Sequence, residues 1–234
     1  NVTARMNQPF IKEFKEEREL TLMLLVDVSS SGNFGSTGKL KNEVSAEIAS
    51  ILAFAAIKNN DKIGLIVFSD KIEHTIPPKK GKAHIWNIIR TILDFKPEGK
   101  GTNLSLPLEY LLNVQKRKTT TFLISDYQDD GYETKLKLVK QKHDLVAISI
   151  TDPREESLPD VGLIQLEDTE SEETLLVDTS DSEMIRQYSE QMQVKKENRR
   201  TYFQSIGIDT IEIKTNKSLA DPIIRYFKLR EKKH

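Results

Sequence analysis

Three short segments of this chain carry the oxygen-bearing side chains that could act together, and two of these segments come directly after an apolar run. Asp27-Val28-Ser29-Ser30-Ser31 follows the apolar residues 22–26, and Ser125-Asp126 follows residues 121–124. Between them in the sequence, Gly101-Thr102-Asn103 lies in a stretch rich in Gly, Lys and Pro. Carboxylate and hydroxyl oxygens, with neither sulfur nor nitrogen, suit a hard cation such as Mg²⁺. The three segments together therefore predict a site for a divalent metal ion.

The spacing within the first segment explains how several of these oxygens would face one ion. In an extended loop, alternate side chains point the same way, so Asp27, Ser29 and Ser31 are expected to face a common point. Thr102 would add a third hydroxyl and Asp126 a second carboxylate. Because Mg²⁺ prefers octahedral coordination by oxygen, these five residues leave a position open to water or to an acidic group of a partner.

Apolar runs of strand length alternate with stretches of helical periodicity along most of the chain. The run 20–26 is apolar almost throughout, as is typical of a strand buried on both faces. Asp70-Lys71 predicts a tight turn between two hairpin strands, and Pro77-Pro78 is expected to end the second of them. The predicted strands are 20–26, 62–69, 72–76, 120–125, 144–150 and 208–213, and the predicted helices are 40–59, 83–95, 104–115, 133–142, 181–203 and 219–228.

This alternation predicts an α/β fold with a doubly wound, mostly parallel sheet, one antiparallel hairpin strand and helices on both faces. In such a sheet, ligands bind in the crevice at the carboxyl ends of the strands, where the first and third polar segments would lie. Residues 161–166 and 174–177 flank an acidic stretch and predict a small hairpin insertion, near 161–177, over the rim of this crevice. Residues 1–19 are expected to form an extended arm with an edge strand near Phe10–Phe14, and residues 20–234 one domain.

Composition restricts the classes of function. With 35 basic and 36 acidic residues the net charge is −1, which argues against a nucleic-acid partner because that requires a basic face. The chain has no cysteine, so disulfides, thiol catalysis and thiolate metal sites are excluded. No apolar run approaches the roughly 20 residues that span a bilayer. We therefore expect a cytoplasmic protein with no membrane span in this chain.

The polar segments resemble the metal-ion-dependent adhesion site of von Willebrand factor A domains. The D-x-S-x-S pattern of that family falls on Asp27, Ser29 and Ser31, its loop threonine on Thr102 and its distal aspartate on Asp126. The resemblance implies that the hydroxyls contact the ion, Mg²⁺ or Mn²⁺, and that the aspartates act largely through water. Many such domains carry Met after the second serine, and this chain has Gly32 there, which puts the loop packing in question.

A narrower resemblance is to the DUF58 family of bacterial A-domain-like proteins. It rests on residues 16–21 before the metal strand and on Thr151-Asp152-Pro153-Arg154-Glu155-Glu156 with Leu158-Pro159-Asp160 after residue 150. Residues 1–5 resemble the end of an upstream segment of that family, so the chain is expected to be part of a longer protein. The resemblance implies a MoxR-type AAA+ ATPase, or its client, as the partner in assembling or activating other proteins.

The sequence therefore predicts a metal-dependent protein-binding module and not an enzyme, since no general base accompanies the oxygen ligands. An acidic group of the partner would complete the shell of the ion. The loops 29–38, 96–102 and 127–132 would form the rim around it. The predicted rim residues are Asn33, Phe34, Lys100, Asn103, Tyr127, Gln128 and Asp129.

Two alternatives remain open. A phosphatase of the haloacid-dehalogenase type would use Asp27 as nucleophile and Asp129-Asp130 as metal ligands, but it needs a second Asp where this chain has Ser29. A scaffold with a vestigial, empty site is the other. Two side interpretations concern structure alone: Asp152-Pro153 is expected to form a turn, and Trp86 is expected to pack in the core beside Ile85, Ile88 and Ile89.

Overall fold

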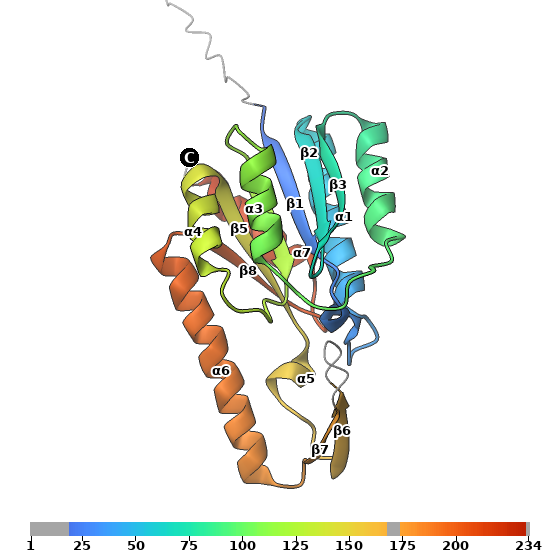
Figure 1. The fold of residues 1–234 in the computed structure, drawn as a ribbon, viewed down its shortest axis with the longest axis vertical. Helices are drawn as coiled ribbons and strands as arrows, with labels where there is room; N and C mark the ends of the chain where they lie inside the picture. Colours follow the sequence, from blue (N-terminus) through green and yellow to red (C-terminus); the bar gives the residue numbers. More distant parts are fainter. Residues whose placement is uncertain (1–18, 168–173, 233–234) are drawn as a thin grey trace, which may run out of the picture.

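The computed structural model describes residues 19–167 and 174–232, and its centre is one twisted sheet (Figure 1). The strand order is β3-β2-β1-β4-β5-β8, and every neighbouring pair is parallel except β2 and β3. This confirms the predicted doubly wound sheet with one antiparallel hairpin strand. The strands are β1 (Thr21–Asp27), β2 (Lys62–Phe68), β3 (Ile72–Lys79), β4 (Thr120–Ser125), β5 (Asp144–Thr151) and β8 (Asp209–Lys214).

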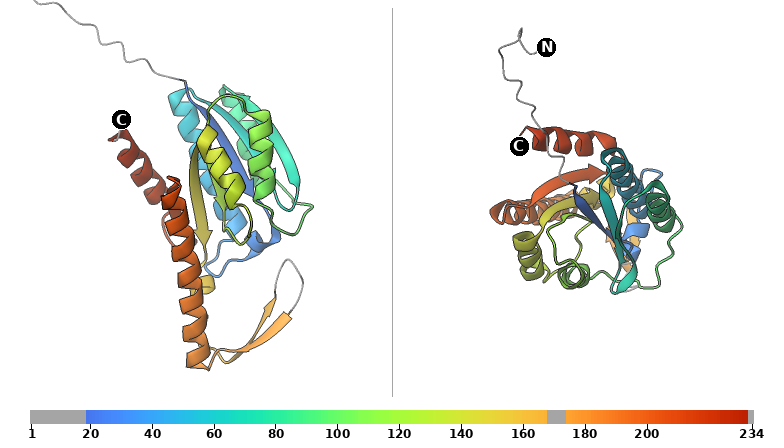
Figure 2. Two further views of the ribbon diagram at one scale, coloured as in Figure 1. Left: turned by 60° about the vertical axis from the view of Figure 1, so that its left-hand side comes forward. Right: turned by 90° about the horizontal axis from the view of Figure 1, so that it is seen from above.

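Helices cover both faces of the sheet, as the right-hand view of Figure 2 shows from above. One apolar core lies under α1 (Lys41–Asn59), α2 (Lys82–Leu93) and α7 (Ala220–Glu231). The other lies under α3 (Ser105–Val114), α4 (Glu133–Lys142) and the end of α6 (Ser182–Ser205). Successive residues of β1 alternate between the two cores, because strand side chains alternate between faces. The continuous apolar runs of the sequence follow from this double burial.

A smaller part of the chain extends beyond the carboxyl ends of the strands (Figure 1). It comprises α5 (Pro153–Glu156), the antiparallel pair β6 (Leu163–Glu167) and β7 (Thr174–Asp178), and the first half of α6. The predicted hairpin insertion is confirmed as a sheet of its own. We call residues 153–167 and 174–194 the carboxyl-side extension. The predicted arm up to residue 18, with its edge strand near Phe10–Phe14, lies outside the described residues.

Two local predictions differ from the structure. The β3 strand does not stop at Pro77-Pro78 but continues to Lys79; it is an edge strand, so a proline can lack its N–H on the solvent side without breaking the sheet. Trp86 is 56% exposed and contacts Phe54 edge-to-face, with ring centroids 5.5 Å apart. The buried stripe of α2 consists of its four isoleucines, which leaves Trp86 on the outer side. No helix of the described residues is both long and apolar enough to cross a membrane.

Candidate metal site

The carboxyl ends of β1 and β4 bring the first and third polar segments together, because these two strands are neighbours in the sheet. Asp27 ends β1 and is only 4% exposed. Its Oδ1 accepts the Ser29 N–H at 3.0 Å, and its Oδ2 accepts the Ser125 hydroxyl at 2.6 Å. The Ser125 Oγ in turn accepts the Tyr127 N–H at 2.9 Å. The carboxylate is therefore held from both sides before any ligand arrives.

The two serines of the D-x-S-x-S segment lie at a spacing that suits an octahedral ion. A short 3₁₀ helix, η1 (Ser30–Asn33), curls the loop after Ser29 and was not predicted from the sequence. The Oγ atoms of Ser29 and Ser31 are 3.0 Å apart. Adjacent corners of an octahedron with metal–oxygen bonds of about 2.1 Å are about 3.0 Å apart. The 3.0 Å spacing, which the two hydroxyls keep by sharing a hydrogen bond, is therefore compatible with two adjacent ligands of Mg²⁺.

A small polar cavity of about 10 Å³ joins these groups. This volume is about that of one water-sized group. Four of the five predicted ligands line it: Asp27 ends β1, Ser29 and Ser31 lie in the loop and η1 that follow, and Asp126 comes directly after β4. Its lining residues are Asp27, Ser29, Ser31, Gly32, Lys41, Asn42, Ser45, Ser125, Asp126 and Ile150.

Thr102, the fifth predicted ligand, is half-buried and is not among the residues that line this cavity. Its loop is nevertheless fixed at the same end of the sheet. The Ser30 N–H donates to the Lys100 carbonyl at 2.9 Å, and the Asn103 N–H donates to the Ser69 carbonyl at 3.0 Å. The Leu104 N–H donates to Asp129 Oδ2 at 2.7 Å, so the Asp129 carboxylate helps to fix the end of this loop.

Within residues 19–167 and 174–232, no three His, Cys, Asp or Glu side chains group as they would to hold a metal ion. An ion at this cavity would thus depend on hydroxyl oxygens together with Asp27 and Asp126. This donor set is hard and carries few charges, which suits Mg²⁺ or Mn²⁺ better than a metal that prefers nitrogen or sulfur.

The surroundings of Asp27 in the cavity disfavour the charged form of its carboxyl group. Burial, together with the neighbouring charge of Asp126, raises the pKa of Asp27 to about 6, although the hydrogen bonds from Ser125 and Ser29 oppose the shift. A cation placed between the Asp27 and Asp126 carboxylates would offset the cost of burying the Asp27 charge and would reduce the repulsion between the two anions.

A buried lysine that the sequence analysis missed lies beside Asp126. The Lys41 Nζ is 2.6 Å from Asp126 Oδ2 and 2.5 Å from Glu155 Oε1. Burial alone would lower the pKa of Lys41, but the charges of Asp126 and Glu155 outweigh it and raise the pKa. Glu155 lies in Asp152-Pro153-Arg154-Glu155, where we predicted a turn. The segment forms α5, and Asp152 and Glu155 form a capping box at its start.

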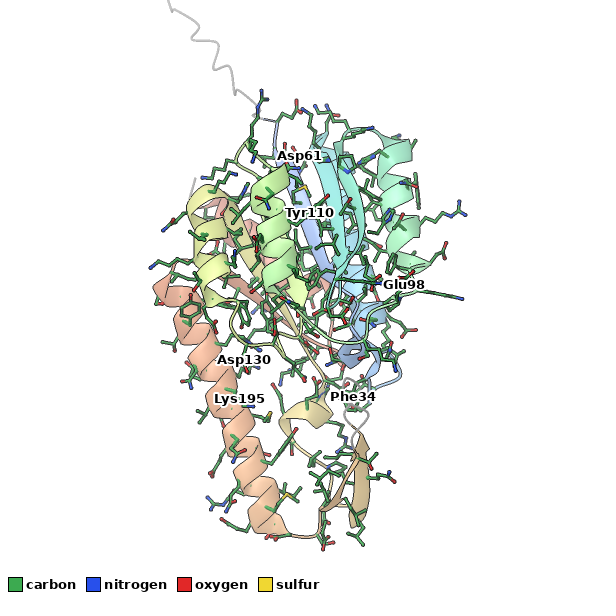
Figure 3. The ribbon with its side chains drawn as sticks, in the orientation of Figure 1. Phe34, Asp61, Glu98, Tyr110, Asp130 and Lys195 are labelled. Atoms are coloured by element: carbon green, nitrogen blue, oxygen red, sulfur yellow. The ribbon has the colours of Figure 1, made fainter. Side chains whose placement is uncertain are left out.

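The predicted rim residues surround this end of the sheet, with one exception. Tyr127 is buried: its hydroxyl donates to the Leu123 carbonyl at 2.9 Å, and its ring packs on Phe203. It lies in the core beneath the rim, and its backbone is in the left-handed region, at φ 59°. Figure 3 labels Phe34, which is 40% exposed, and Asp130 at this end of the sheet. The remaining predicted rim residues are exposed or half-buried: Asn33, Lys100, Asn103, Gln128 and Asp129.

The departure at Gly32 has a physical reason. A Cβ at this position would lie 1.8 Å from the Asn42 side-chain oxygen. The Asn42 Nδ2 donates to the Ser29 carbonyl at 3.3 Å and to Asn33 Oδ1 at 3.2 Å. Asn42 therefore occupies the space of a side chain at residue 32 and holds the serine loop in its place.

Comparison with known proteins agrees with this architecture. The model of DUF58, a protein family of unknown function, matches residues 1–198. An uncharacterised protein of Mycobacterium tuberculosis (Rv1480) is 28% identical over 173 residues, which are 73% of this chain and 55% of that protein. The chain thus spans about half the length of this relative.

Two solved structures share the fold at low sequence identity. The conserved hypothetical protein BatB from Bacteroides thetaiotaomicron has a TM-score of 0.56 at 12% identity, covering 91% of this chain and 98% of BatB. The VWA domain of SpRpn10 has a TM-score of 0.51 at 11% identity, covering 89% of this chain and 95% of that domain. This chain therefore belongs to the DUF58 family and has the fold of a von Willebrand factor A domain.

Proposed function

We propose that this domain is a protein-binding module that depends on a divalent metal ion, Mg²⁺ or Mn²⁺, and that it is not an enzyme. The observation that carries the proposal is the set of carboxylate and hydroxyl oxygens that Asp27, Ser29, Ser31 and Asp126 bring to one cavity, with the two serine oxygens 3.0 Å apart. Thr102 is the fifth proposed ligand, from a loop that is fixed at the same end of the sheet. When bound, the ion would supply a Lewis-acidic point for an oxygen ligand of the partner.

The proposed partner ligand is an acidic side chain. The rim offers the exposed cation Lys100 and the exposed ring of Phe34, which suit an acidic group flanked by apolar residues. The partner that the family resemblance suggests is a MoxR-type AAA+ ATPase or its client, met in the cytoplasm. The A-domain fold is compatible with this role because its loops meet at one edge of the sheet.

The first experiment is a titration of metal-stripped protein with Mg²⁺ and with Mn²⁺, read by calorimetry and thermal melting. Because an ion that binds the folded state stabilises it, saturating metal should raise the Tm of wild type. The variant Asp27→Ala should lose the response, whereas Asp61→Ala, which removes a buried carboxylate at the other end of the sheet, should keep it.

The second experiment tests the partner. A purified MoxR-type AAA+ ATPase, or an acidic peptide, is offered to wild type with Mg²⁺, to wild type with EDTA and to Asp27→Ala. Capture in the first sample alone supports the proposal. Absence of any metal response in folded wild type would favour the vestigial scaffold, and metal-dependent release of phosphate from a generic aryl phosphate, lost on Asp27→Asn, would favour the phosphatase.

A further inference from the structure

The Lys41 ammonium is the notable group at this site, because a buried lysine is costly unless its charge is matched. Its side chain is 3% exposed, and those of its partners Asp126 and Glu155 are 5% and 19% exposed. Lys41 comes from the first turn of α1, Asp126 from the end of β4 and Glu155 from α5. One cation therefore joins a proposed metal ligand to the carboxyl-side extension.

We propose that Lys41 is an internal cation that competes with the divalent ion for Asp126 and thereby sets the metal affinity of the site. This inference rests on the proposed function. Lys41 and four of the five proposed ligands line the same cavity of about 10 Å³, so an ion there would lie close to the ammonium. Like charges at such distances repel strongly where water is excluded.

Glu155 provides the second position that such competition requires. Its Oε1 accepts from Lys41 and also from Gln128 Nε2 at 2.9 Å, while its Oε2 accepts the Asp152 N–H at 2.9 Å. The carboxylate is thus fixed on α5 and can retain the ammonium when Asp126 turns to another cation. Without the charge of Glu155, Lys41 would have Asp126 as its remaining anionic partner, and the ion would compete less well.

The geometry also links the site to the carboxyl-side extension. The Tyr188 hydroxyl of α6 donates to the Glu155 carbonyl at 3.1 Å, and Arg199 of α6 donates to the Asp126 carbonyl at 3.1 Å. A change in the sharing of Lys41 between its two carboxylates therefore acts on residues that hold α5 and α6 in place.

The test compares Lys41→Met with Lys39→Met by calorimetry of metal-stripped protein with Mg²⁺. Both variants remove one positive charge, but Lys39 pairs with Glu47 at the surface, where the two side chains are 50% and 47% exposed. Lys41→Met is expected to bind Mg²⁺ tighter than wild type by about tenfold or more. Its metal-free form should melt lower and gain more in Tm from the ion. Lys39→Met should match wild type within about twofold.

The companion variant Glu155→Gln has the opposite expected sign. It keeps the side-chain shape, removes the competing carboxylate charge and should weaken Mg²⁺ binding by several-fold. Glu156→Gln is its control, because Glu156 pairs with Lys196 and Lys214 and not with Lys41.

The outcomes separate this inference from the proposed function. If folded wild type and all variants bind no metal, the proposed function fails and the inference with it. If wild type binds but Lys41→Met binds no tighter, the inference alone is overturned. Should Lys41→Met fail to fold, Glu155→Gln decides: unchanged or tighter binding overturns the role of Lys41.

Discussion

The ion pairs at the two ends of the sheet differ in their exposure to water. At the amino end, Glu19 pairs with Lys62 and Lys80, and all three side chains are 34–44% exposed. At the carboxyl end, Lys41 and Asp126 pair at 3% and 5% exposure. Figure 3 places Asp61 at the first end and Phe34 at the second. Because exposed pairs contribute little and buried charges are costly when unmatched, the difference indicates that the carboxyl end holds charge for a purpose other than stability.

Buried polar groups at the amino end are simpler. Asp61 accepts the Leu20 N–H at 3.0 Å, and the His143 Nδ1 lies 2.9 Å from the Thr119 hydroxyl. Each of these contacts joins two neighbouring segments at the amino end of the sheet. The carboxyl end instead joins β1, β4, α1 and α5 through one connected set of oxygens and a single ammonium. Four substitutions test this contrast, from the largest expected effect to the smallest.

Asp152→Ala is expected to cause the largest loss of stability. Asp152 is fully buried, and its carboxylate accepts from the Ser36 N–H and hydroxyl, the Arg154 N–H and the Thr215 hydroxyl. Removing it takes the acceptor from the buried Thr215 hydroxyl and from the part-buried donors of Ser36 and Arg154, so the free energy of unfolding should fall by about 2–4 kcal/mol. Urea denaturation measures this. Asp152→Asn keeps one oxygen acceptor and should lose less; equal and small losses in both would contradict the role assigned to these bonds.

Asp27→Asn is expected to stabilise the metal-free protein. Burial and the nearby charge of Asp126 raise the pKa of Asp27 to about 6, so at pH 7.5 the folded state holds an anion that it disfavours. Neutralising it should raise the free energy of unfolding in EDTA by about 1–3 kcal/mol while abolishing any metal response. Asp61→Asn should gain less, because burial raises the pKa of Asp61 but the hydrogen bond from the Leu20 N–H, and then the charge of Lys80, oppose the rise. A loss of stability in Asp27→Asn would contradict the strain assigned to this end.

His143 gives the amino end its own pH dependence. Burial, followed by the charge of Lys142, lowers the pKa of His143. Its Nδ1 lies 3.3 Å from the Thr119 N–H, which donates to it, and its Nε2 has no hydrogen-bond partner among the described residues. The folded state therefore favours neutral imidazole.

The sign of the pH effect follows from this lowered pKa. The stability due to neutral His143 is fully present above the unfolded pKa of about 6.5 and is lost as pH falls through the folded pKa. Below pH 6.5, wild type should lose up to about 1.4 kcal/mol per pH unit through this group. His143→Asn, whose amide oxygen can still accept the Thr119 N–H, should show a shallower loss in urea denaturation between pH 7 and pH 5. Parallel curves for the two proteins would exclude His143 as the source.

Much of the fold could be predicted because its signals are local. The apolar run before Asp27 marks a doubly buried strand, and the structure has β1 there with six buried residues in sequence. The sequence offers Ser182 or Asp181 as the cap of α6, and in the structure the Asp181 side chain accepts the Glu183 and Met184 N–H groups. The grouping of Asp27, Ser29 and Ser31 is likewise local, and Asp126 joins them because β1 and β4 end side by side.

The features that were missed depend on contacts between distant residues. Lys41 contacts Glu155, 114 positions away, and the sequence around each is that of an ordinary charged helix start. The exposure of Trp86 depends on which side of α2 meets α1, and the path of β3 through Pro77-Pro78 depends on its place at the sheet edge. Strand periodicity carries no information about the place of β3 in the sheet, whereas the helical spacing of the four isoleucines of α2 already leaves Trp86 outside the buried stripe. The buried lysine thus had to be found from the packing.

Glu19→Gln should have the smallest effect, and it is the sharpest check on the contrast between the two ends. The hydrogen bonds from Lys62 and Lys80 lower the pKa of Glu19, as expected of a favourable pair, but water reaches all three side chains. Exposed pairs of this kind gain little from folding and are weakened further by salt. The Tm should therefore move by less than about 2 °C, both at low salt and in 0.5 M NaCl, where the Debye length is about 4 Å. A loss of stability comparable to that of Asp152→Ala would mean that the amino end also depends on its ion pairs. The burial of a charged side chain would then not distinguish the charges proposed to act in binding from the charges of an ordinary surface.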